Sequence, residues 1–113
     1  MNMKQETINE LKKLTCRYLD QNETFSLLRS ELLMYLSWGV SKGMRFQDTG
    51  LLLKVNGHHH KGWVFITLNG SDLYDVHLLN NRYRVLQTIT DIYFTELCDT
   101  IDENIERIPE YNR

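Results

Sequence analysis

The sequence predicts an α+β protein: two N-terminal helices, a four-stranded antiparallel β-meander, and a C-terminal amphipathic helix that packs on the sheet. Three observations lead to this prediction. Apolar residues recur at three- and four-residue steps near both ends of the chain, which is the period of one helix face. Apolar and polar residues alternate over short runs in the middle of the chain. Asn-Gly and Asn-Asn pairs, which are typical of tight hairpin turns, separate these runs.

Residues 1–38 are predicted to be helical. The first helix is expected from Lys4 to Leu19, and the second begins at Asn22 or Thr24, which are both good N-cap residues. The second helix carries apolar residues on more than one face, so it is expected to be buried on most sides. Gly39 is placed to end it in a left-handed conformation. The apolar stripe of the first helix consists of Ile8, Leu11, Leu14, Tyr18 and Leu19.

Residues 40–50 are polar and contain glycines, which predicts a loop. The β-meander is expected over residues 51–90. Its second strand is apolar on both faces, so it should be central and covered on both sides. The Asn69-Gly70 pair is expected to form a turn in which both residues accept a positive φ. The four predicted strands are Leu51–Asn56, Trp63–Asn69, Leu73–Asn80 and Arg82–Thr90.

The last helix is predicted over residues 91–108, and Pro109 should end it and leave 109–113 as a tail. Its other faces are strongly acidic and include Asp102, Glu103 and Glu106. An acidic helix of this kind can be a solvated face or can dock on a basic surface. The apolar stripe expected to cover the sheet consists of Phe94, Leu97, Ile101, Ile105 and Ile108.

Composition sets limits on function. The chain of 113 residues is expected to form a single domain, and its 25% charged and 42% hydrophobic residues are ordinary for a globular protein. A net charge of -2 does not favour a general nucleic-acid binder. Cys16 and Cys98 lie too far apart in sequence for a metal knuckle, and no cofactor is expected. Without an apolar signal region or a long apolar run, a cytoplasmic location and no membrane partner are expected.

One central segment resembles a known group of proteins. The stretch ITLNGSDLYDV, from Ile66 to Val76, is similar to a recurring segment in small, functionally uncharacterised proteins of bacteriophages and prophages. The segments Arg82–Val85 and Ile92–Leu97 fall where those proteins have similar residues. The resemblance extends from Leu33 to Ile105. It implies a phage or mobile-element origin and a location in the host cytoplasm, and it implies no activity.

Two clusters in the predicted meander could carry chemistry. Asp75, His77 and Arg84 would meet on one face if the third and fourth strands pair, and could then act in acid–base chemistry or bind an anion. The alternative is an ordinary polar face with a cross-strand ion pair. Trp63 and Phe65 could stack unpaired bases beside Arg82 and Arg84. The alternative is that both aromatic residues belong to the core.

The run His58-His59-His60 could bind a transition metal, because neutral imidazole is a common ligand. No Cys or carboxylate lies nearby in sequence to complete a tetrahedral set, so the alternative is a solvated hairpin tip. The sequence leaves metal binding at this run open. No spacing typical of a catalytic site is present elsewhere, so the protein is not expected to be an enzyme.

These observations favour a small, non-enzymatic protein–protein interaction module encoded by a phage or mobile element. Its partner could be a host defence component, a phage assembly protein, or a second copy of the chain. The alternative is a nucleic-acid-binding accessory protein that uses the basic-aromatic face. The candidate contact residues are Arg82, Arg84, Asp75, His77, Trp63, Phe65, Glu103 and Glu106.

Overall fold

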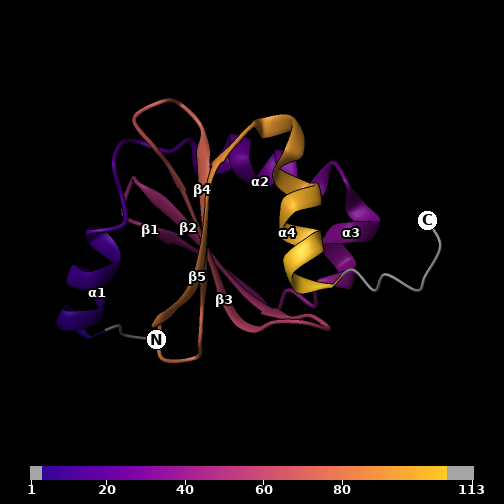
Figure 1. Ribbon diagram of the computed structural model, residues 1–113, viewed down its shortest axis with the longest axis horizontal. Coiled ribbons are helices and arrows are strands. Elements are labelled where there is room, and N and C mark those ends of the chain that lie inside the picture. Colours follow the sequence, from indigo (N-terminus) through magenta and orange to yellow (C-terminus); the bar gives the residue numbers. More distant parts are fainter. Residues whose placement is uncertain (1–3, 107–113) are drawn as a thin grey trace.

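A computed structural model of the chain describes residues 4–106 and contains one five-stranded antiparallel sheet with the strand order β1-β2-β3-β4-β5 (Figure 1). The predicted α+β class and antiparallel sheet are therefore confirmed. The predicted second strand corresponds to β3, which is central as expected. The strands are β1 (Lys42–Phe46), β2 (Gly50–Asn56), β3 (Lys61–Leu68), β4 (Tyr74–Leu79) and β5 (Val85–Ile92).

Helices cover both faces of the sheet. Helix α1 (Gln5–Lys12) lies on one face, and α2 (Gln21–Arg29), α3 (Leu32–Ser37) and α4 (Leu97–Ile105) lie on the other (Figure 1). A short 3-10 turn, η1 (Phe94–Glu96), precedes α4. The larger core forms between the sheet and the three helices, and the smaller one forms under α1.

The first helix ends earlier than predicted, at Lys12 instead of Leu19. Leu14 and Thr15 donate to carbonyls three residues earlier, which closes the helix with a tight turn. The chain must then pass from the α1 face of the sheet to the opposite face. It does so past the β3–β4 turn, where Arg17 forms an ion pair with Asp72. This crossing cannot remain helical, and it leaves Tyr18 exposed.

The second predicted helix is divided in two. Asp20 caps α2 by accepting a hydrogen bond from the Glu23 amide at 3.0 Å, so the predicted caps at Asn22 and Thr24 are wrong. The helix stops after Arg29, and α3 begins at Leu32. Gly39 follows α3 with a φ of 63°, which confirms the predicted left-handed end.

The predicted loop at residues 40–50 contains strand β1, so the sheet has one strand more than predicted. Met44 and Phe46 alternate toward the α1 side and pack in the smaller core, a two-residue period that is the signal of a strand. The buried side chain of Gln21 holds the hairpin that follows. Its Nε2 donates to the carbonyls of Gln47 at 2.9 Å and Gly50 at 2.8 Å.

Two of the three predicted hairpins share one turn design that differs from the prediction. Asn69 and Asn80 each accept amide hydrogen bonds on the side-chain oxygen from residues two and four positions later. The positive φ falls on the fourth residue of each turn, at Asp72 and Tyr83, and not on Gly70. Each turn is therefore longer than a two-residue loop, and strand β5 begins at Val85 instead of Arg82.

The C-terminal helix is shorter than predicted over the described residues. Strand β5 extends through Ile92, and α4 itself begins at Leu97. Leu97, Ile101 and Ile105 are buried as predicted, whereas Phe94 is 64% exposed and does not belong to the core stripe. Ile108, Pro109 and the predicted tail lie outside the described residues.

Candidate functional site

Helix α3 is apolar on all sides, although only one side packs against the protein. Met34 and Tyr35 contact the larger core. On the outward side, Leu32, Leu33 and Leu36 are 54%, 83% and 61% exposed. We call these three residues the leucine face. A short helix with three exposed leucines is unusual on a protein surface, and such patches commonly mark sites of contact with another protein. The prediction that this part of the chain is buried on most sides is wrong.

A buried hydrogen bond fixes α3 against α4. The indole Nε1 of Trp38 donates to Oδ1 of Asp102 at 3.1 Å, and both residues are buried. Asp102 therefore does not belong to a solvent-facing acidic surface, contrary to the sequence prediction. The Tyr35 and Trp38 rings also contact each other, with their centroids 5.9 Å apart. The leucine face is thus presented on a helix anchored at its C-terminal end.

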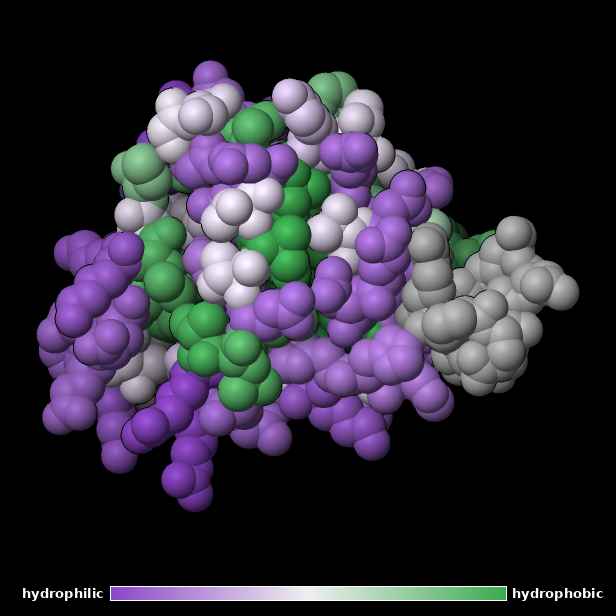
Figure 2. All heavy atoms as spheres, in the orientation of Figure 1, coloured by the Kyte–Doolittle hydropathy of each residue, from purple (hydrophilic) through white to green (hydrophobic). Residues whose placement is uncertain are grey.

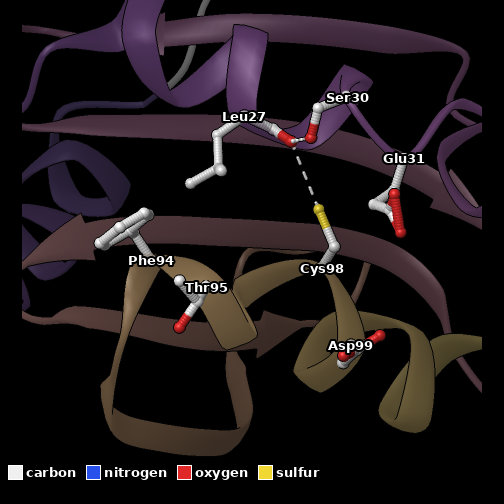
Figure 3. Close-up of a pocket in the computed structure, with 7 residues that line it drawn as sticks. All are labelled: Leu27, Ser30, Glu31, Phe94, Thr95, Cys98 and Asp99. Carbon is white, nitrogen blue, oxygen red and sulfur yellow. Dashed lines mark hydrogen bonds between the residues drawn. The ribbon is translucent and has the colours of Figure 1, made fainter.

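A pocket of about 260 Å³ lies beside α3, between the end of α2 and the start of α4 (Figure 3). The Cys98 thiol donates weakly to the carbonyls of Leu27 at 3.5 Å and Leu28 at 3.8 Å. Burial is the main cause that raises the pKa of this thiol to about 11. The negative charges of Glu31 and Asp99 contribute smaller parts of this rise in the pKa. The thiol therefore stays protonated at neutral pH and is a poor nucleophile. The lining residues are Leu27, Ser30, Glu31, Phe94, Thr95, Cys98 and Asp99.

The pocket and the leucine face are continuous in the chain, because Glu31 lines the pocket and Leu32 follows it. Phe94 and Leu27 supply apolar wall, and Glu31 and Asp99 supply negative charge. Within residues 4–106 neither carboxylate forms an ion pair. The pocket therefore suits the aliphatic stem and cationic head of a lysine or arginine side chain.

The predicted basic-aromatic face does not form. Trp63 and Phe65 are 2% and 0% exposed and pack in the smaller core under α1. Helix α1 covers this face of the sheet, where Leu11 packs in the same core as both rings. Neither ring is available to stack on an unpaired base.

Arg82 and Arg84 are exposed, but they lie in the β4–β5 turn and not on a strand. The turn itself lies beside Lys54, whose Nζ donates to Asn81 Oδ1 at 2.8 Å. Lys42 lies opposite Lys54 in the β1–β2 pair. In the part of the chain that the structure describes, none of these four cations is in an ion pair. We call this group the basic end.

The predicted cluster of Asp75, His77 and Arg84 is not assembled. The carboxylate of Asp75 accepts from Asn69 Nδ2 at 2.9 Å and from the Asp91 amide at 3.0 Å, both near the end of β5. Arg84 precedes the start of the same strand. At about 3.3 Å per residue, the seven residues from Arg84 to Asp91 separate the two sites by roughly 20 Å.

His77 is a buried structural residue. Its ring forms hydrogen bonds with Thr88 Oγ1 at 3.0 Å and Thr67 Oγ1 at 3.4 Å, on the same face as Phe65. Burial lowers the pKa of His77 below its ordinary value, and the nearby Asp75 charge opposes this only in part. The folded protein therefore holds His77 in its neutral form.

This lowered pKa predicts a loss of stability in acid. Below about pH 6.5 the unfolded chain takes up a proton on His77 before the folded protein does, so the free energy of unfolding decreases as the pH falls. We expect a His77→Gln variant, measured by urea unfolding at pH 7 and pH 5, to lose less stability between these values than the parent. An equal loss in both proteins would contradict this assignment.

The histidine run is only partly a solvated tip. His58 and His59 are exposed, but His60 is buried and its Nε2 donates to the Trp63 carbonyl at 3.1 Å. The loop also docks on the end of α4, where Glu106 accepts from the His58 amide at 2.7 Å and Ile105 accepts from the His59 amide. Glu106 is thus a structural contact, whereas Glu103 is exposed.

Among residues 4–106, no group of three or more His, Cys, Asp or Glu side chains is placed to hold a metal ion. None of the helices in this range has the length and apolar character needed to cross a bilayer. The sequence matches no protein-family model, and no curated protein or solved structure is similar enough to count as a match.

Proposed function

We propose that the protein is a non-enzymatic interaction module that binds another protein through the leucine face and the adjoining Cys98 pocket. The exposure of Leu32, Leu33 and Leu36 on one anchored helix is the observation that supports this most strongly. Burying three leucine side chains would contribute several kcal/mol to association, at about 25 cal/mol per Å² of apolar surface. We further propose, from the resemblance of Ile66–Val76, that a phage or mobile element encodes it and that it acts in the host cytoplasm.

The residues that could have carried catalysis are used in other ways. Asp75 and His77 take part in structural hydrogen bonds within the sheet. The Cys98 thiol is held in its protonated form by burial and by neighbouring carboxylates. These assignments favour binding over catalysis.

Nucleic-acid binding remains the alternative function, and the basic end is the observation that favours it. Lys42, Lys54, Arg82 and Arg84 gather at one end of the sheet, and cations of this kind contact phosphate groups. Trp63 and Phe65, the residues predicted to stack on bases, are buried, so this alternative would depend on the backbone charges of the nucleic acid. Its affinity would fall steeply as salt rises.

The test is affinity capture from a bacterial host lysate, with and without nuclease. We expect a nuclease-resistant protein partner that a Leu33→Glu/Leu36→Glu variant captures at least about tenfold less well, because a charge buried in an apolar contact costs more than 1.4 kcal/mol. Both positions are exposed, so the variant should keep the parent's melting temperature.

An Arg82→Ser/Arg84→Ser variant is the matched control, since it alters the basic end and leaves α3 unchanged. It should capture the same partner normally. Capture that depends on these arginines and disappears with nuclease would contradict the proposal and support nucleic-acid binding.

A further inference from the structure

Strand β5 is an exposed edge of the sheet. It pairs with β4 on one side only, and of its eight residues only Ile92 is buried. In Figures 1 and 2 this edge faces the viewer, and green and pale side chains form a band between hydrophilic ones. Val85 and Leu86 are 44% and 62% exposed. An unpaired strand of this kind offers a row of backbone groups for pairing with another strand.

The two edges of the sheet differ in charge. Strand β1 carries Lys42 and Arg45, which are exposed, and charges on an edge strand oppose pairing with another copy. In β5 the six residues from Val85 to Thr90 (VLQTIT) contain no charge and no proline. Four of these six are β-branched residues, which strands prefer: Val85, Thr88, Ile89 and Thr90.

We propose that two copies of the protein associate through antiparallel pairing of their β5 strands, which joins their sheets into one ten-stranded sheet. This inference concerns a different surface from the leucine face and goes beyond the proposed function. Pairing about a two-fold axis perpendicular to the sheet keeps α1 of both copies on one side and α2–α4 on the other. The strand is regular at Gln87, Thr88 and Ile89, between register shifts near its two ends, so the axis falls in this region.

The charges that flank the neutral stretch identify the occupant as a second copy. Arg84 precedes the stretch and Asp91 follows it. With the axis at Gln87 or at Thr88, antiparallel pairing places the Arg84 end of each strand beside the Asp91 end of the other. The two-fold axis repeats this arrangement, so charges of opposite sign face each other at both ends of the neutral stretch.

The test is the mass of the full-length protein in solution, measured by light scattering and by sedimentation over a wide range of concentrations. We expect a species of about twice the chain mass of 13.5 kDa. Leu86→Lys places like charges near the axis and should weaken dimerisation by about tenfold or more, because such juxtaposition costs over 1.4 kcal/mol. Leu33→Lys is the matched control and should leave the dimer intact.

Exchanging the charges of Arg84 and Asp91 tests the antiparallel pairing without replacing an apolar residue by a charged one. Arg84→Asp alone and Asp91→Lys alone should each weaken the dimer, and the double variant should restore it. Melting temperatures show that each variant is folded. A monomeric parent, a dimer lost with Leu33→Lys instead of Leu86→Lys, or failure of the double variant to recover would each overturn the proposal.

Discussion

Replacing Ile101 with alanine is expected to lower the free energy of unfolding by about 2–5 kcal/mol. Ile101 is fully buried in the larger core, where α4 packs on the sheet beside α2 and α3. The loss combines the apolar surface removed and the cavity left behind. Domains of this size have only about 5–15 kcal/mol in total, so the melting temperature should fall markedly.

Urea unfolding of a graded series checks this expectation. Ile101→Val removes a single methylene group and should cost about 0.5–1.5 kcal/mol. An Ile101→Ala protein as stable as the parent would show that α4 does not contribute to the core in the way described.

Gly62→Ala is expected to destabilise the protein by at least about 3 kcal/mol or to prevent folding. Gly62 lies in the central strand β3 with a φ of 154°, a conformation that residues with a side chain rarely adopt. An added Cβ would overlap the backbone carbonyl of Leu79 in β4 and would lie 3.3 Å from Asn80 Cα. Both atoms belong to backbone, so neither can rotate away.

Gly70→Ala is the matched control. Gly70 has no positive φ, and its added Cβ would meet only Cys16 Sγ at an ordinary 3.8 Å. This variant should unfold within about 1 kcal/mol of the parent, because alanine also restricts the unfolded chain. Equal effects of the two substitutions in urea unfolding would contradict the backbone assignment at Gly62.

The sheet was predictable where side-chain alternation and turn residues agreed. Val64 and Ile66 on one face and Trp63 and Phe65 on the other identified β3 as a doubly covered strand. The sequence does not predict strand β1, because Gly43 and the charged Lys42 and Arg45 interrupt its apolar residues. Its place in the sheet depends on tertiary contacts, such as that between the Gln21 side chain and the following hairpin.

Turn geometry was predicted less well than turn position. Asn69 and Asn80 mark turns because their side chains bond to nearby amides, and the sequence shows this. The residue with positive φ is set by the length of the turn, which local preference does not determine. Tyr83 accepts that conformation while its ring stacks on Trp63, with centroids 5.2 Å apart.

The candidate site was the least predictable part. Leu32, Leu33 and Leu36 belong to a run of apolar residues, and helical period alone does not show which side of such a run remains uncovered. Asp102 resembles its acidic neighbours in sequence, and only the position of Trp38 explains its burial. The clustering of Arg82 and Arg84 with Lys42 and Lys54 depends on which residues pair between neighbouring strands. Lys42 lies in β1, which the sequence does not predict, so its pairing with Lys54 cannot be predicted either.

The central claim is that the leucine face and the Cys98 pocket contact a partner protein. Backbone amide hydrogen exchange, measured on the protein alone and in complex with the captured partner, tests it most directly. We expect slower exchange on binding over residues 31–37 and 94–99. Slower exchange confined to the basic end, with no change in these two segments, would contradict it.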